Sequence, residues 1–240
     1  MPRARILILV FVVSLLVFGL WRLPAAPVLA QLDGVQIDGQ PLQLERVQGR
    51  IWDGKAQWAW ADQQGHFGWA LAWRGLRPGA NLVLTSAAGS LRGWATGTPS
   101  RVTLEEVRVD VALAPLSRGL GVGQAEGEVL GLLSRVSWQR SGLLQVDGVL
   151  HYGGGSVRWQ GGGAEAPPLE ARLFNEGEVA RMVTTAPDGA TVADAQVKDG
   201  LAQVRVYRVW PRLLGVSQGG SDEDVVFEVS QPLVPSGGQS

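Results

Sequence analysis

The chain of 240 residues contains no cysteine. This absence excludes a disulfide framework, a thiol nucleophile and a thiolate metal site. Histidine is also scarce, because only His66 and His151 occur, and neither has a second histidine at metal-ligand spacing. The sequence therefore indicates no zinc site, and we expect His66 to be a solvated residue in a turn.

A charge excess of either sign is lacking as well. The 21 basic and 22 acidic residues are interspersed, so no basic stripe suggests a nucleic-acid partner. The chain has no Gly-x-Ser-x-Gly, phosphate-loop or dinucleotide-binding motif. Asp222, Glu223 and Asp224 are consecutive and lack the alternating spacing of a calcium loop. The sequence therefore predicts no catalytic residue, no cofactor and no metal site.

Only one long apolar run is present, from Ile6 to Trp21, interrupted by Ser14. At about 1.5 Å per residue this run is roughly 24 Å long, and the next two residues extend it to the thickness of a bilayer core. Arg3 and Arg5 precede it, so the positive-inside rule places the N-terminus in the cytoplasm and the bulk of the chain across the membrane. The residues expected to contact lipid are Ile6, Leu7, Leu9, Phe11, Leu15, Phe18 and Trp21.

Two fates of this segment stay open. Val28, Leu29 and Ala30 would suit a signal peptidase that cleaves before Gln31, whereas the long gap between the apolar run and that point favours a retained anchor. The predicted organisation is a cytoplasmic stub at 1–5, an anchor or uncleaved signal at 6–23, a linker at 24–34, one β domain at 35–233 and a flexible tail at 234–240.

Beyond the linker, apolar and polar residues alternate with a period of two. Val107, Val109, Val111 and Leu113 line one face of a predicted strand, and Glu105-Glu106 interrupts the alternation where a β-bulge would fit. Two further sets share a face in the same way: Leu169, Ala171 and Leu173, and Val225, Phe227 and Val229. No later stretch has the period of a helix of three turns, and only 175–183 and 211–215 suggest a turn or two. The pattern predicts a mainly β fold with an antiparallel sheet of many short strands.

The sequence contains 33 glycines, many of which lie between the alternating segments. Aspartate-glycine pairs predict hairpin turns at 33–34, 38–39, 53–54, 147–148, 188–189 and 199–200. Similar glycine-bounded segments begin at Gly49, Gly89, Gly127 and Gly148. They fit either a sheet of repeated hairpins or a chance recurrence in a glycine-rich chain.

Five tryptophans are concentrated in one region, at Trp52, Trp58, Trp60, Trp69 and Trp73. Trp58 and Trp60 share one strand face, Trp69 and Trp73 share another, and a polar turn over 62–66 would bring the two faces together. Two interpretations remain. We favour a core, because each buried tryptophan contributes up to about 5 kcal/mol. The other interpretation is an exposed aromatic groove for a lipid or a partner.

Two segments of this region resemble a known family. They are Val47-Gln-Gly-Arg-Ile-Trp-Asp-Gly-Lys-Ala56 and Gly68-Trp-Ala-Leu-Ala-Trp-Arg74, which follow the short N-terminal apolar run. This layout resembles the N protein family of the bacterial type II (general) secretion pathway. Segment 127–138 and Leu213-Leu-Gly215 look similar more loosely, so the resemblance covers most of the chain in layout.

The resemblance implies a single-pass protein of the inner membrane of Gram-negative bacteria, with its main domain in the periplasm. That domain would support export of folded proteins across the outer membrane through contacts with other secretion subunits, without enzymatic activity. The family also looks similar to AsmA-type lipid-transfer proteins, which implies a curved, half-barrel or groove-like sheet. A second interpretation follows, in which the chain is a lipid-binding or lipid-transfer protein with an aromatic-lined groove.

Overall fold

The computed structural model describes residues 24–26, 30, 36–37, 40–60, 63–98, 100–120, 123–139, 144–216 and 219–232. The predicted anchor at 6–23, its lipid-contacting residues, most of the linker and the tail at 234–240 lie outside these ranges. Within them, no helix has the length and apolar character needed to cross a membrane. The chain divides into two compact units, Met1–Leu71 and Ala72–Ser240, which we describe separately.

The described part of the first unit is a small β structure. Its strands are β1 (Gln36–Ile37), β2 (Gln40–Pro41), β3 (Gln43–Gly49), β4 (Asp53–Trp60) and β5 (Gln63–Arg74), the last of which continues into the second unit. β1 pairs with β2, and β4 pairs antiparallel with β3 on one side and with β5 on the other.

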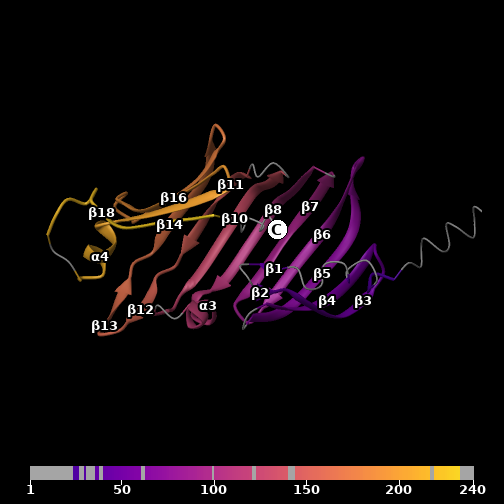
Figure 1. Cartoon of the computed structure of the whole chain (residues 1–240), viewed down its shortest axis with the longest axis horizontal. Coiled ribbons are helices and arrows are strands. Elements are labelled where there is room, and N and C mark those ends of the chain that lie inside the picture. The colour runs from indigo at the N-terminus through magenta and orange to yellow at the C-terminus, as the bar shows by residue number, and fades with distance from the viewer. Residues whose placement is uncertain are drawn as a thin grey trace, which may run out of the picture. The chain divides into compact units, whose positions relative to one another are not determined.

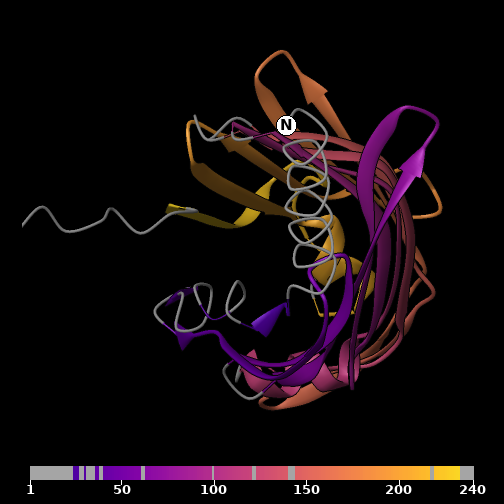
Figure 2. The ribbon, with the colours of Figure 1, turned by 90° about the vertical axis from the view of Figure 1, so that its right-hand side faces the viewer.

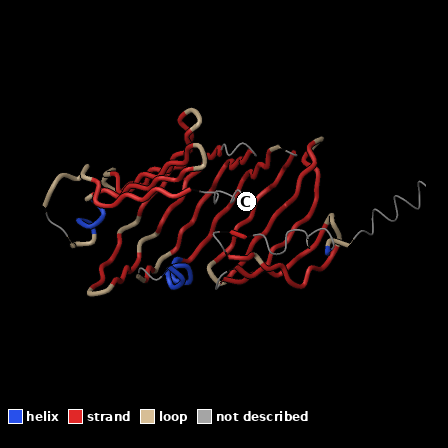
Figure 3. Tube along the Cα trace, in the orientation of Figure 1, coloured by secondary structure: helices blue, strands red, loops and turns tan. Residues whose placement is uncertain are grey.

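The second unit is built around a large antiparallel sheet that is not closed (Figures 1 and 3). Its strands are β6 (Arg77–Ser86), β7 (Gly89–Thr98), β8 (Arg101–Ala112), β10 (Glu128–Gln139), β11 (Leu144–Tyr152), β14 (Leu169–Glu176), β15 (Val179–Thr185), β16 (Thr191–Lys198), β17 (Leu201–Tyr207) and β18 (Val225–Pro232). They lie in this order across the sheet, with β18 last. Figure 2 shows the magenta and orange strands of this unit following an arc.

In the described part of the second unit, two helices and a side sheet accompany the main sheet. The helices are α3 (Leu113–Leu120), which contacts β9, and α4 (Val209–Leu213), which contacts β16. The side sheet joins β9 (Gln124–Ala125), β12 (Gly155–Trp159) and β13 (Gly162–Ala166). These elements are inserted between strands of the main sheet, whose own strands follow one another in chain order.

The two faces of the main sheet differ in character. Directly opposed residues of antiparallel strands point to the same face, so the register assigns each side chain. Val109, for example, is opposite Leu91 and Gly131, whereas Arg108 is opposite Arg92 and Leu132. We call the face of Val109 the apolar face and the face of Arg108 the polar face.

The predicted bulge is confirmed. The register between β7 and β8 shifts after Arg92 and resumes at Trp94 opposite Glu105, and Glu106 has a φ of 52°. A second shift lies next to it, between Leu133 and Arg135 of β10. The extra residue in each strand locally increases the twist of the sheet.

Several expectations about local structure are corrected. The strands are longer than predicted, since β8 and β10 each span 12 residues. Leu113 begins a helix instead of ending a strand, and 175–183 forms the ends of two paired strands instead of a helical connector. The expected turn near 211–215 is confirmed as part of α4.

The predicted aspartate-glycine turns at 33–34 and 38–39 lie outside the described residues, and the other four pairs behave in two ways. Those at 188–189 and 199–200 lie in turns as predicted. Asp53-Gly54 and Asp147-Gly148 instead lie within β4 and β11. Val225 is also corrected, because a bulge separates it from the face shared by Phe227 and Val229.

Candidate functional site

The apolar face of the second unit is the most extensive chemical feature of the described residues. It runs across ten strands, and its residues are Leu82, Leu84, Leu91, Val107, Val109, Val111, Val129, Leu133, Leu150, Tyr152, Leu169, Ala171, Leu173, Ala180, Met182, Ala193, Ala195, Val204, Val206, Phe227 and Val229. No aspartate, glutamate, lysine or arginine occurs in this set. Such a face has the chemistry to bind an apolar chain or an apolar protein surface.

Most of this face is only half-buried. Of its members, only Val107 and Ala180 are buried, at 1% and 3% exposure. Among the described residues, α4 packs through Val209 against Ala186 and Val192 near one end of the sheet, and α3 contacts the side sheet. The described part of the second unit is thus largely a single layer, in which an apolar face stays accessible.

Two glycines make part of the apolar face flatter, because leucine side chains of neighbouring strands lie over them. The Leu150 side chain lies over Gly131 of β10, and Leu133 lies over Gly148 of β11. A Cβ at Gly148 would stand 2.6 Å from the Leu133 Cα, so no larger residue fits there without a shift of the backbone. The leucines therefore lie along the sheet instead of standing on it, and Gly131 and Gly148 have a packing role.

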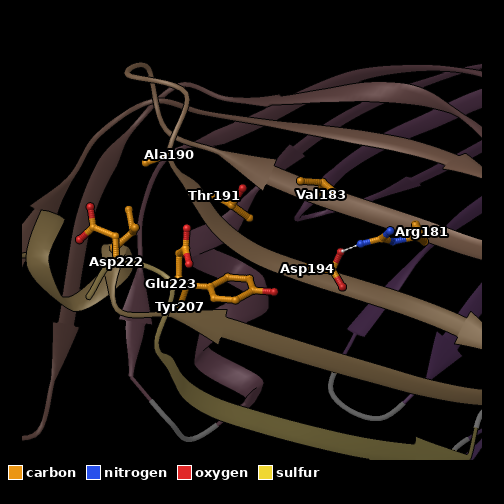
Figure 4. Close-up of a pocket in the computed structure, with 9 residues that line it drawn as sticks. Arg181, Val183, Ala190, Thr191, Asp194, Tyr207, Asp222 and Glu223 are labelled. Atoms are coloured by element: carbon orange, nitrogen blue, oxygen red, sulfur yellow. Dashed lines mark hydrogen bonds and ion pairs between the residues drawn. The ribbon is translucent and has the colours of Figure 1, made fainter. Parts of the chain in front are cut away.

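The polar face contains a compact ionic cluster near α4. The Asp194 carboxylate, 3% exposed, accepts hydrogen bonds from Arg181 Nη2 at 2.6 Å and from Arg205 Nη2 at 3.1 Å. Figure 4 shows Arg181 and Asp194 pointing toward each other from neighbouring strands. The hydrogen bond to Asp194, followed by that to Glu176, raises the pKa of Arg181 above its ordinary value.

Two hollows lie on the polar face. One, of about 550 Å³, extends from the ionic cluster to Tyr207, Asp222 and Glu223 (Figure 4). The other, of about 760 Å³, exposes Leu130 and Leu132 between Arg108 and Arg172. Three charged side chains that line the first hollow, Arg181, Asp194 and Asp222, are paired within the protein, which is the arrangement of a structural network.

The tryptophans of the first unit meet on one face, as predicted. Trp58 and Trp60 of β4 share that face with Phe67 and Trp69 of β5, because Ala56 is opposite Phe67 and Gly54 is opposite Trp69. The Trp69 ring lies over Gly54 and stacks beside Phe67, with ring centroids 5.7 Å apart. All four aromatic side chains are half-buried.

Two backbone contacts fix the segment before β4. Trp69 Nε1 donates a hydrogen bond to the Ile51 carbonyl at 3.0 Å, and the Leu71 amide donates to the Trp52 carbonyl at 2.6 Å. Trp52 itself is half-buried. The two motif segments are therefore in direct contact through side chain and backbone.

Trp73 does not fit the favoured core interpretation, because it is 71% exposed. The deeply buried indole is instead Trp94 of β7, at 2% exposure, which the sequence did not single out. Gly79 lies against its ring on one side, and the Arg74 guanidinium lies 4.6 Å from the ring centroid. The glycine next to it in sequence, Gly93, was the available signal for a packed position.

The other candidate residues are dispersed. His66 lies within β5 and not in a turn, where Gln57 Nε2 approaches its Nε2 at 3.4 Å. His151 is exposed on β11, with its Nδ1 3.6 Å from Glu170. Asp222 and Asp224 form ion pairs with Arg212 and Arg208. In the part of the chain that the structure describes, no group of three or more histidine, aspartate or glutamate side chains is placed to hold a metal ion.

Comparison with known proteins adds no relative to this picture. No protein-family model, no curated protein and no solved structure matches the chain.

Proposed function

We propose that this chain is an accessory inner-membrane subunit of a type II secretion system, with its β domain in the periplasm and without enzymatic activity. The observation that supports this proposal is the contact between the two motif segments. The residues that resemble the N protein family, around Ile51 to Ala56 and around Trp69, form one paired β structure instead of two unrelated stretches.

The contact between the two motif segments depends on the particular residues at Gly54 and Trp69. Gly54 provides the flat surface that the Trp69 ring requires, and the Ile51 carbonyl accepts the hydrogen bond of the indole N–H. This hydrogen bond of a half-buried indole contributes about 1 kcal/mol. The spacing of glycine and tryptophan in the two segments thus has a common structural cause, which favours a family signature over coincidence.

The secretion proposal is tested in the native host. Deletion of the gene should leave folded substrate proteins of the secretion system in the periplasm, and the full-length gene should restore their export. Trp69→Ala should fail to restore export, whereas His66→Ala, which changes an exposed residue of the same strand, should restore it. Unchanged export in the deletion strain would refute the proposal.

The membrane topology has its own test. A periplasm-dependent reporter enzyme fused after Ser240 should be active, because the two arginines before the apolar run place the N-terminus in the cytoplasm. A cytoplasm-dependent reporter at the same position should be inactive. The reverse result would overturn the proposed location.

A second candidate function is lipid binding, which the half-buried apolar face of the second unit favours. Burial of each methylene of an acyl chain contributes about 0.8 kcal/mol, so ten methylenes along this face would contribute roughly 8 kcal/mol before entropic costs. A curved sheet of the AsmA type would hold such a chain along its groove. The flat part of the apolar face at Gly131 and Gly148 suits an extended chain.

Two adjacent residues provide a matched test of lipid binding. Val129 lies on the apolar face of β10, and Leu130, 50% exposed, lies on the polar face. Val129→Asp should remove phospholipid that copurifies with the protein, as measured by native mass spectrometry, and Leu130→Asp should retain it. Far-UV circular dichroism checks that both variants fold. Equal lipid in both variants, or none in the unmodified protein, would contradict this function.

A further inference from the structure

β18 ends the main sheet with an exposed apolar strand. It pairs with β17, and the strand order of the described residues places no other strand beyond it. Its side chains at Val225, Val226, Phe227 and Val229 are 41–57% exposed. An edge of this kind presents unpaired backbone N–H and C=O groups beside apolar side chains, which is the template for addition of another strand.

The usual protections of an edge strand are weak here. Lysine or arginine is absent from β18, and its one charged residue, Glu228, accepts a hydrogen bond from Gln203 of β17. The bulge lies at Val226, near the beginning, and the only proline is the terminal Pro232. From Phe227 to Gln231 the strand pairs with β17 in regular register, so this part of the edge has no bulge and carries a single charge, at Glu228.

We propose that β18 pairs antiparallel with β18 of a second copy of this chain, across a two-fold axis perpendicular to the sheet. Such an axis keeps the faces of both copies on the same side. Phe227 and Val229 belong to the apolar face, so the pairing joins the two apolar faces into one. This inference is independent of the secretion and lipid-binding proposals, because it rests on the sheet edge alone.

Charge and length restrict the register. A two-fold axis perpendicular to the sheet places one residue of β18 directly opposite the same residue of the second copy. This residue cannot be Glu228, because the two carboxylates would repel each other. An axis at Val229 leaves Glu228 opposite Ser230 of the second copy and aligns 226–232 of both strands. An axis at Phe227 aligns only 225–229. The geometry therefore favours Val229, since it pairs the longer stretch of strand.

The absence of native cysteine permits a sharp test by disulfide cross-linking of the full chain in membranes. Opposed residues of antiparallel strands have Cα atoms about 4.5–5.5 Å apart, within the disulfide range, whereas identical residues one position from the axis are about 8 Å apart. When single cysteines are placed at 227, 228, 229 and 230, the yield of disulfide-linked dimer should therefore have one sharp maximum, at Val229→Cys.

The control is Leu130→Cys, which is similarly exposed but lies on a strand paired on both sides. Val229→Cys should give about tenfold more disulfide-linked dimer than this control, given the strict distance requirement. In the Val229→Cys background, Phe227→Lys should reduce the dimer severalfold because it charges the edge, and Leu130→Lys should leave it unchanged.

Four outcomes would overturn the proposal. The first is a yield of disulfide-linked dimer no greater than that of the control, and the second is an equal yield at all four positions. The third is a maximum yield at Glu228→Cys, and the fourth is cross-linking to other proteins in place of a dimer. The last would assign the edge to a different partner.

Discussion

Trp94 provides the most direct test of how the main sheet of the second unit is stabilised. It is 2% exposed, with Gly79 against one side of the ring and the Arg74 guanidinium 4.6 Å from the ring centroid. We predict that Trp94→Ala lowers the free energy of unfolding by about 4 kcal/mol. The matched control is Trp73→Ala, because the same substitution there removes a side chain that is 71% exposed.

The magnitude follows from the area buried. A fully buried tryptophan removes roughly 200–250 Å² from water, which corresponds to an upper bound of about 6 kcal/mol at 25 cal/mol/Å². A compact unfolded state reduces this value by about a third, within the range found for large-to-small changes in cores. For Trp73, less than a third of the area is buried, and the same reasoning gives about 1 kcal/mol.

The assay is equilibrium unfolding in urea of the full chain in detergent, followed by far-UV circular dichroism and linear extrapolation. A double-mutant cycle with Arg74→Gln should show a coupling of about 0.5–1 kcal/mol for the cation–π contact. Equal losses for Trp94→Ala and Trp73→Ala would refute the argument, because they would show that burial in this sheet does not determine the contribution of a tryptophan.

Three further predictions use the same preparation. Asp194→Ala should lower stability by roughly 3 kcal/mol in the urea assay, because it leaves two arginines without their shared buried carboxylate; a loss below about 0.5 kcal/mol would contradict this role. Ultraviolet titration of a Tyr207→Phe variant should place the pKa of Tyr152 above 10.0, because burial and, to a smaller extent, the charge of Glu165 disfavour its phenolate. The raised pKa contributes stability that is fully present below pH 10 and is lost as the pH rises through the folded-state value, so unfolding should become easier there, and an unshifted titration would contradict the burial. Gly148→Ala should cost about 2 kcal/mol in the urea assay, because its Cβ would meet the backbone of the neighbouring strand, and an unchanged midpoint would show that the strands separate freely at this point.

Features that depend on local alternation could be predicted from the sequence. The period of two around Val109 assigned its face correctly, and the Glu105-Glu106 interruption located a bulge, because both follow from backbone geometry over a few residues. The grouping of Trp58 with Trp69 also followed from strand parity and a short connection.

Features that depend on pairing partners could not be predicted. Asp147-Gly148 has the composition of a turn, yet Gly148 is required within β11 because Leu133 lies over it. Residues 175–183 suggested a helical turn or two, but Asn175 ties a strand to its neighbour: its Oδ1 accepts a hydrogen bond from the Val146 amide at 2.7 Å, and its Nδ2 donates to the Leu144 carbonyl at 3.0 Å. In both cases the determining residue is distant in sequence.

The helix α3 was missed for a different reason. Leu113 continues the alternation of the preceding strand, so it was assigned to that strand. A proline in the first turn of a helix removes no intrahelical hydrogen bond, so Pro115 is compatible with a helix that begins at Leu113. The exposure of Trp73 was likewise not predicted. The alternation of side chains along a strand assigns a residue to one face of the sheet, but it does not show whether other residues cover that face.

The sequential strand order of the second unit also has a consequence for how the protein unfolds. Each strand from β6 to β18 touches little besides its immediate neighbours, as do the units of a repeat protein, so stability should add up along one dimension. Local opening should then start at β18 and spread inward strand by strand, and amide hydrogen exchange should slow progressively toward β8 and β10. A molecule that captures the last strand would therefore slow exchange far from the place where it binds.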